Sequence, residues 1–448
     1  MNQCLYTLKC QVTGKVNMPD WMFVLWAGGT ALLSYSLVYA LRKPFTAIEF
    51  TGQEVFGMDY KIAVSMVQLL GYVVAKMLGI KFISELKSEN RLIFIIGSAA
   101  LSEASLLLFA LLPSPYNVCA LFFNGLSLGC MWGVIFSFLE GRRTTDILAS
   151  IMGVSMALSS GLAKSVGLYT LNVLEVNEYW MPAFIGAIAF PLLCFLGWVM
   201  TQLPDPTLAD MAARSPRCTL NRRERMHLFR QFMPLLILLF SANLLLTVQR
   251  DVKEDFIVCI IDVSTISSWL FARLDAIATL IMLTVFAFLG RTKNHLNVLG
   301  VLLLLSTLGM GTLVLITTYA DKVISTSTWL FLQTLCLDIA YLSFQTIFFE
   351  RFIACFKIKG NVGFFIITLD FIGYVGTLAL LFFKETFASQ IDWRSFYDEM
   401  SLYIGIFCCV AFIVSWGYVL YYYMHQKKIS QKNMDYSCTL DNWEVKCI

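Results

Sequence analysis

The sequence predicts an all-α integral membrane protein with twelve transmembrane helices in two six-helix halves. Of the 448 residues, 58% are hydrophobic and only 14% are charged, and the mean hydropathy is +0.71. This composition supplies too little polar surface to cover a soluble globule. The chain also contains twelve apolar runs of about 20 residues, the length that a helix needs to cross a bilayer. One long polar stretch divides these runs into six and six.

The predicted elements follow in order along the chain. The N-terminal half, residues 1–203, contains spans at 21–42, 61–82, 92–112, 117–139, 147–171 and 180–202. The C-terminal half, residues 233–426, contains spans at 233–250, 266–289, 295–318, 327–349, 363–383 and 401–423. Residues 204–232 are predicted to form a central cytoplasmic loop, and residues 427–448 a polar cytoplasmic tail. These runs suit helices better than the short alternating strands of a barrel.

The distribution of basic residues predicts the orientation in the membrane. Lys and Arg are concentrated in the N-terminus, in the loops from even to odd spans and in the tail. Because basic loops stay on the cytoplasmic side, both termini are predicted to be cytoplasmic. The first apolar run is long and lacks a small-residue cleavage site, so we expect it to act as an uncleaved insertion signal in the cell membrane, plasma or inner.

Several functional classes find no support in the sequence. A net charge of +3 gives no reason to expect a nucleic-acid partner. The 13 cysteines are scattered without a CxxC pair, which favours packing residues over disulfides or metal ligands. HExxH, DxD and GxxxxGK[ST] patterns are absent, so we expect no enzyme, catalytic residue, metal or cofactor. The expected partners are the lipid bilayer and a small molecule, and the chain is expected to be a monomer.

Ionisable residues within the spans are the main functional signal. Each costs on the order of 2.5–3.5 kcal/mol in hydrocarbon by insertion scales, so such residues usually face a bundle interior or a wet cavity. The residues in or at the edge of spans are Arg42, Lys76, Glu103, Lys164, Arg250, Arg273, Asp275, Asp338 and Asp370.

At helical spacing, other polar side chains lie on the same helix face as several of these charged residues. In the first span, Tyr35, Tyr39 and Arg42 follow one another at i, i+4 and i+7 on one stripe. The seventh span repeats this geometry, so the two halves carry an arginine at matching points. The other polar stripes are Asn243, Thr247 and Arg250; Gln68, Tyr72 and Lys76; Thr334, Asp338, Tyr341 and Gln345; and Asp370, Tyr374 and Thr377. These stripes predict a central aqueous cavity.

The cations predict an anionic ligand. Arginine holds phosphate or carboxylate oxygens through paired N–H donors, and lysine adds a point charge. Arg42 and Arg250, with Tyr35, Tyr39, Tyr72, Asn243, Lys76 and Lys164 beside them, are therefore the candidate substrate-binding residues. Glu103, Asp275, Asp338 and Asp370 are the candidates for coupling protons or balancing the charge of an empty site.

Structural alternatives stay open at this point. Arg42 and Arg250 can instead be helix-end anchors that snorkel to the membrane interface. Lys76 and Lys164 can be held in ion pairs with Glu103 or with an acid of the other half. The aspartates of spans ten and eleven can be structural partners of a cation rather than proton sites.

Two sequence elements resemble a known family. They are Tyr39-Ala40-Leu41-Arg42-Lys43-Pro44-Phe45 and Gly71-Tyr72-Val73-Val74-Ala75-Lys76, followed by Gly79 and Ser84-Glu85. The segment resembles the first two helices of the organophosphate:phosphate antiporter branch of the major facilitator superfamily, and a poorly characterised bacterial family of the same kind with Arg-Lys-Pro-Phe. The resemblance implies the major facilitator fold, and substrate contacts by Arg42, Arg250 and Lys76.

The sequence also departs from that branch. Ser84-Glu85-Leu86 stands where the superfamily has an Asp followed by an Arg, and the histidine of its fifth helix has no equivalent here, although Lys164 lies in that span. The function that the sequence favours is a secondary transporter that works by alternating access. The alternatives are a sensor that binds an anion in a transporter fold without moving it and, with less support, a membrane enzyme.

Overall fold

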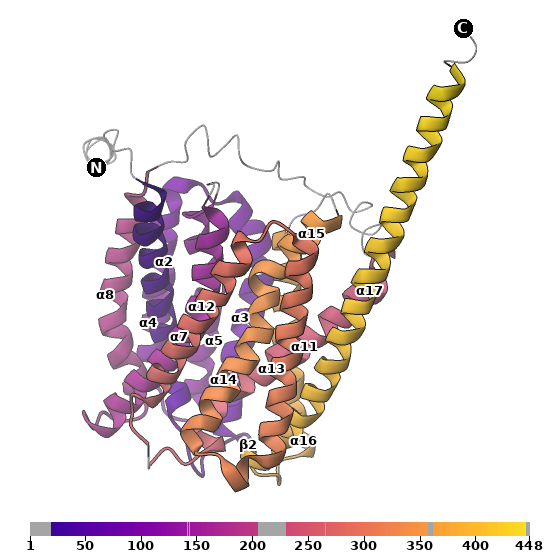
Figure 1. Ribbon diagram of the computed structural model, residues 1–448. Helices are drawn as coiled ribbons and strands as arrows, with labels where there is room; N and C mark the ends of the chain where they lie inside the picture. The colour runs from indigo at the N-terminus through magenta and orange to yellow at the C-terminus, as the bar shows by residue number, and fades with distance from the viewer. Residues whose placement is uncertain are drawn as a thin grey trace.

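The computed structural model describes residues 19–140, 142, 144–204, 230–264, 266–356 and 362–444. Long helices run up and down in one bundle, and the start of the first described helix lies on the same face as the end from which the last one leaves (Figure 1). We call this face the terminal face. The N-terminal helices are α2 (Asp20–Arg42), α3 (Tyr60–Glu85), α4 (Arg91–Leu111), α5 (Ala120–Leu128), α6 (Met131–Ser137), α7 (Thr145–Asn172) and α8 (Met181–Thr201).

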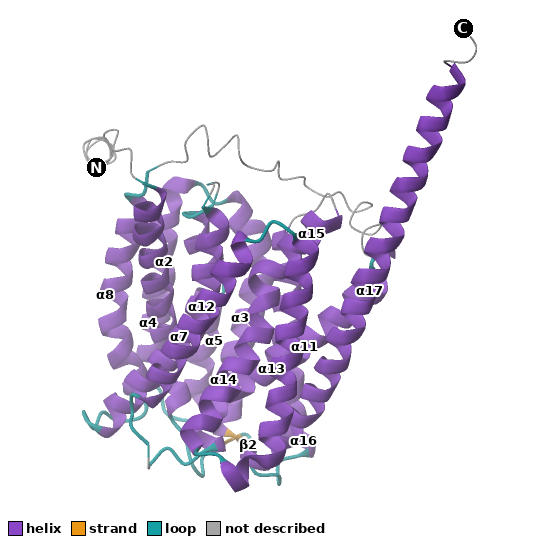
Figure 2. Cartoon of the chain, viewed as in Figure 1, coloured by secondary structure: helices purple, strands orange, loops and turns teal. Residues whose placement is uncertain are grey.

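The C-terminal half repeats this plan. Its helices are α11 (Met233–Ile260), α12 (Leu270–Arg291), α13 (His295–Val323), α14 (Thr326–Ser343), α15 (Phe349–Phe356), α16 (Val362–Phe387) and α17 (Trp393–Glu444). A single π-helical turn, η4 (Phe344–Phe348), joins α14 to α15. Short 3-10 turns η1 (Pro44–Ala47), η2 (Ser88–Asn90) and η3 (Tyr116–Cys119), and the two-residue antiparallel strands β1 (Glu54–Val55) and β2 (Met58–Asp59), complete the described elements (Figure 2).

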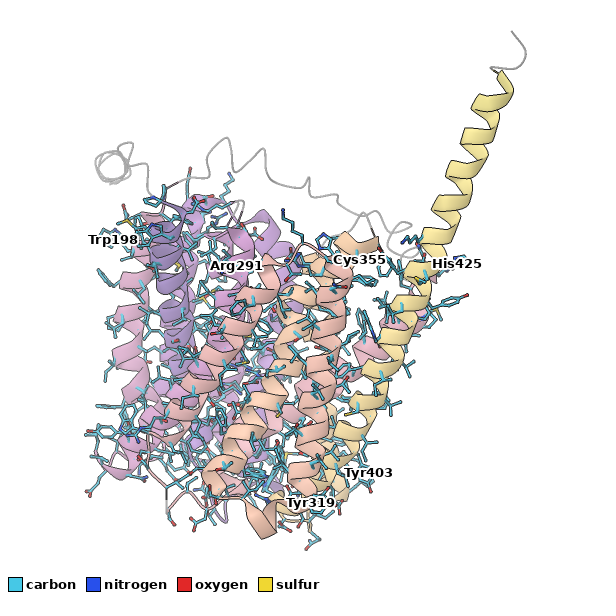
Figure 3. All side chains as sticks on the ribbon, in the orientation of Figure 1. Trp198, Arg291, Tyr319, Cys355, Tyr403 and His425 are labelled. Atoms are coloured by element: carbon cyan, nitrogen blue, oxygen red, sulfur yellow. The ribbon has the colours of Figure 1, made fainter. Side chains whose placement is uncertain are left out.

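The predicted fold class is confirmed. Among the described residues, eleven helical segments are long and apolar enough to cross a membrane, with α5 and α6 counted together and α14 to α15 counted together. Helix α16 supplies the twelfth segment of the predicted pattern. Exposed aromatic side chains lie near both ends of the bundle, with Trp198 near the terminal face and Tyr319 and Tyr403 near the opposite face (Figure 3). Aromatic residues are enriched at membrane–water interfaces in this way.

The main boundary error concerns the seventh span. It was predicted to end at residue 250, but α11 continues to Ile260. The apolar run ends at Arg250 because the charged residues Asp251, Lys253 and Glu254 follow it. In the structure, however, these charged residues are buried. Their partners, described below, let the helix remain inside the protein.

Two other predicted segments differ from the structure or fall outside it. Residues 427–444, predicted as a tail, continue α17 as helix beyond the rest of the bundle (Figure 1). Most of the predicted central loop, residues 205–229, lies outside the described residues, as do 445–448.

Close packing of small residues sets the position of α3. A Cβ atom at Gly71 would lie 2.1 Å from the carbonyl oxygen of Phe122, and one at Gly125 would lie 2.0 Å from that of Gln68. Only glycine permits this approach, which is the usual role of small residues between membrane helices. The α3–α5 contact brings Gln68 to the end of α2.

Contacts between the halves follow two helix pairs. Helix α7 packs along α12, and α3 packs along α16, while η1 rests against α11. The residues at the centre of the bundle therefore come from both halves.

Candidate functional site

Arg42 is the last residue of α2 and is buried, with 5% of its surface exposed. Helix α2 ends inside the bundle, where its terminal carbonyl groups need partners that water cannot supply. Gln68 donates to the Arg42 carbonyl oxygen at 2.8 Å, and Asn124 donates to that of Leu41 at 3.1 Å. Gln68 also donates to Asn124 at 2.8 Å, so side chains of α3 and α5 fix the end of α2.

Three tyrosines surround the Arg42 guanidinium. Its Cζ atom lies 4.0 Å from the ring centroid of Tyr72, 5.9 Å from that of Tyr39 and 6.0 Å from that of Tyr374. Tyr72 and Tyr374 meet edge to face at 5.2 Å across the two halves. Each ring attracts the cation through its electron-rich face. We call these three side chains the tyrosine cage.

Within the part of the chain that the structure describes, no carboxylate forms an ion pair with Arg42, and its Nε has no hydrogen-bond partner. A buried cation without an anion is costly. The tyrosine cage offsets only part of that cost, because a desolvated cation–π contact contributes about 2 kcal/mol. The guanidinium is therefore suited to receive an anion.

Arg250 lies well inside α11 and is also buried, with 6% of its surface exposed. Its Nε lies 3.4 Å from Oδ1 of Asp338 on α14, and its Cζ lies 4.7 Å from the ring centroid of Tyr341. The Nε and Oδ1 atoms form no hydrogen bond, so the pair is a loose one. The π-helical turn begins three residues after Tyr341, and such turns are frequent at functional sites.

Tyr39 connects the two arginines. It lies in the cage of Arg42 and is close enough to Arg250 to interact with it electrostatically. Asp251 lies within electrostatic range of both arginines and accepts a hydrogen bond from Thr377 at 3.0 Å. Neither arginine is a lipid-facing anchor, because both side chains are buried between the halves.

Three lysines of the N-terminal half pair with acids of the C-terminal half. Lys76 lies 3.0 Å from Asp370, which also accepts from Gln345 at 2.9 Å. Lys43 pairs with Asp255, and Lys164 pairs with Glu254. The alternative that Glu103 pairs with Lys76 or Lys164 is wrong. The other alternative holds, because the partner of each lysine is an acid of the C-terminal half.

Glu254 lies at the centre of a buried polar group. Besides Lys164, it accepts from Ser160 and pairs with Lys253 at 2.9 Å. Lys253 in turn donates to Thr334 at 3.0 Å. Asp275 on α12 lies beside this group and is considered further below.

Other predicted site residues are more peripheral. Glu103 lies between α4 and α8, where its Oε2 would be 2.0 Å from a Cβ at Gly186, and that oxygen has no hydrogen-bond partner. Asn243 contacts Thr247 at 3.5 Å on the same helix. Tyr35 meets Tyr39 edge to face at 5.4 Å, behind the tyrosine cage. The structure does not bring Glu103 together with the central charges.

Sequence reasoning missed the charges that follow Arg250, which are Asp251, Lys253, Glu254 and Asp255. The sequence contains a signal that the helix continues, because apolar residues follow at helical spacing, namely Val252, Phe256 and Ile260. All three are buried in the structure. Charged residues between them had to find partners inside the protein. Lys43 was read only as part of a motif, although it too pairs across the halves.

A family model described as "Family of unknown function (DUF5690)" matches residues 44–423. The chain belongs to this family. No curated protein matches the sequence significantly.

Solved structures of transporters share the fold of this DUF5690 protein. A peptide transporter POT in complex with sulfate matches with a TM-score of 0.58 and 14% identity, over 92% of this chain and 99% of the other. A D-xylose-proton symporter matches with a TM-score of 0.56 and 12% identity, over 88% and 96%. The human organic anion transporter MFSD10 matches with a TM-score of 0.57 and 12% identity, over 89% and 100%. At these identities the likeness establishes the major facilitator fold.

Proposed function

We propose that this protein is a secondary transporter that moves a small organic anion, such as an organophosphate, or phosphate itself, across a membrane by alternating access. The observation that carries the proposal is Arg42, a buried guanidinium that has no acidic partner in the described chain and that shares Tyr39 as a neighbour with Arg250. Two guanidiniums provide the forked donors that oxyanions accept.

Asp338 balances the empty site in this proposal. An arriving anion takes Arg250 from Asp338, whose loose contact at 3.4 Å is easily exchanged. Arg42 gains a first anionic partner at the same time. While the anion binds, Lys76 and Lys164 stay paired with their acids, so they stabilise the surrounding structure rather than holding the ligand.

Ion pairs on both sides of the arginines support alternating access. Helix α3 runs toward the terminal face, so Lys76 and Asp370 lie one turn beyond Tyr72 on that side. Helix α11 runs the other way, so Asp255 and Lys43 lie beyond Arg250 toward the opposite face, by five residues or about 7.5 Å of helix. Opening the site toward either face requires the ion pair on that side to separate. The bound anion meanwhile contacts both halves at a point between the two ion pairs.

Fold and site together favour transport over the other classes. The fold-sharing structures are a peptide transporter, a sugar symporter and an organic anion transporter. Two six-helix halves, residues 1–203 and 233–426, would rock about the arginines. We further propose a monomer in the plasma or inner membrane, with the terminal face toward the cytoplasm.

The test begins with purified protein and a thermal-shift screen of phosphorylated sugars, glycerol phosphates, carboxylates, nucleotides and inorganic phosphate. Hits then enter counterflow assays in proteoliposomes. Arg42→Lys and Arg250→Lys keep the charge but lose the fork, so we expect binding to weaken by about 2–5 kcal/mol, or more than tenfold in Kd. Arg291→Lys, at the exposed end of α12 (Figure 3), is the matched control.

The outcomes separate the candidate functions. Wild-type affinity and exchange in either arginine variant would show that the anion binds elsewhere. A protein that binds an anion but shows no counterflow is a sensor rather than a transporter.

A further inference from the structure

Asp275 is the one predicted coupling residue at the interface between the halves that has neither an ion pair nor a hydrogen bond in the described chain. It lies in the second turn of α12 and only 4% of its surface is exposed. A Cβ at Gly161 of α7 would lie 2.2 Å from its Oδ2, so the carboxyl group rests directly on the backbone of the other half. Glycine at that position is what allows this approach.

The surroundings of Asp275 are strongly charged. Glu254 and Lys253 face it from α11, Lys164 from α7 and Asp338 from α14. Both lysines are already engaged, one on each oxygen of Glu254. An ionised Asp275 would therefore be a buried carboxylate without its own cation, which is costly, whereas a protonated carboxyl group in the same place carries no charge to compensate.

A small cavity connects Asp275 to these lysines. It has a volume of about 10 Å³, and its polar lining consists of Asp275, Lys164, Lys253 and Thr334. A cavity of this size is at the lower limit for one water molecule. One water molecule there would lie beside the Asp275 carboxyl group and the two lysines.

Charge balance connects Asp275 to the anion site. With Arg250 paired to Asp338, this layer holds the cations Arg250, Lys164 and Lys253 and the acids Glu254, Asp338 and Asp275. The layer is neutral when Asp275 is ionised and carries one positive charge when Asp275 is protonated. A bound anion removes that excess charge, so each ligand stabilises the other.

We propose that Asp275 is the proton-binding residue that couples transport, and that a proton on Asp275 and one negative charge of the anion cross together as a symport. The proposal rests on the proposed anion transport. When the proton leaves, the Asp275 carboxylate attracts Lys164 or Lys253 away from Glu254. Because Lys164 belongs to the other half, that exchange changes the α7–α12 interface, where the halves must move.

The first experiment needs no substrate. Infrared difference spectra of the purified wild-type protein, titrated with pH, should contain the C=O stretching band of a protonated carboxylic acid that disappears as the pH rises. Asp275→Asn, which resembles the protonated form in shape and charge, should lack that band. Glu103→Gln is the matched control, since it removes a different carboxyl group, between α4 and α8, whose buried Oε2 has no hydrogen-bond partner among the described residues. Its spectra should keep the band that Asp275→Asn loses. If Asp275→Asn keeps every titrating band of the wild-type protein, the assignment is overturned.

The second experiment measures coupling in proteoliposomes that contain a trapped pH-sensitive dye. External inorganic phosphate or glycerol 3-phosphate should acidify the lumen with wild-type protein and with Glu103→Gln. Asp275→Asn should retain counterflow of the same probe but lose lumenal acidification. Wild-type counterflow without proton movement would overturn the proton proposal and leave anion transport standing. Absent counterflow with an intact Asp275 band would instead refute transport of these probes and retain the proton site.

Discussion

Arg42 and Arg250 occupy matching places in the two halves, yet their surroundings differ. Arg42 ends its helix, is surrounded by tyrosine rings and has no acid in the described chain. Arg250 lies within a longer helix and faces Asp338. The N-terminal half thus holds a buried cation without an acidic partner in the described chain. The matching cation of the C-terminal half has an acidic partner in loose contact. In the proposed mechanism, an arriving anion has to displace only the carboxylate of Asp338.

The helices that carry the two arginines differ in the same sense. Helix α2 stops at Arg42, while α11 continues for ten residues and places Glu254 and Asp255 against lysines of the other half. Helix α11 therefore combines the proposed ligand contact of Arg250 with contacts between the halves. If the proposed anion binds Arg250, α11 is the element that connects this binding to the interface between the halves.

Leucine substitutions should give the largest contrast, because they remove charge and keep an apolar side chain. Arg250→Leu leaves Asp338 buried without its cation, and we expect a loss of about 3–5 kcal/mol of stability. Arg42→Leu removes a cation without an acid, so the empty protein should be as stable as wild type or more so. Thermal unfolding of both variants in detergent measures the difference. Equal destabilisation would mean that Arg42 has a structural partner as strong as Asp338.

Asp338→Asn tests the exchange step with a smaller expected effect. The variant keeps the shape of the side chain but no longer competes for Arg250. We expect anion binding to tighten by about 1–3 kcal/mol, the usual size of coupling between two sites. Asp262→Asn is the control, since Asp262 is an exposed acid that accepts hydrogen bonds from Ser264 and does not pair with an arginine. Titration of the best ligand from the thermal screen decides this, and unchanged affinity in Asp338→Asn would remove Asp338 from the mechanism.

The sequence predicted the fold class because twelve apolar runs and a central polar stretch are read directly from composition. It also predicted which charged residues lie within the membrane, because a charged side chain is costly in hydrocarbon and stands out within an apolar run. Spacing along one helix placed Tyr39 beside Arg42, because residues one turn apart share a face.

Partners on other helices could not be read in this way. Which acid pairs with Lys164 depends on the packing of α7 against α12 and on the position of Glu254 on α11, and Glu254 lay beyond the predicted end of its span. The difference between Arg42 and Arg250 is likewise tertiary, because Asp338 comes from a helix almost ninety residues further along the chain. Local spacing carries no information about such contacts.

The smallest predicted effect concerns the tyrosine cage. Tyr72 has the ring closest to either arginine, at 4.0 Å, compared with 4.7 Å for Tyr341 over Arg250. Tyr72→Leu should weaken anion binding by up to about 2 kcal/mol, because an unsupported guanidinium loses its fixed position. Tyr72→Phe keeps the ring face and should cost less than about 0.5 kcal/mol, the lower end of exposed cation–π energies. Calorimetric titration of both variants separates the two contributions. If the phenylalanine variant lost as much as the leucine variant, the Tyr72 hydroxyl would be a direct donor to the anion, and Arg42 would share its ligand with the cage instead of being held by it.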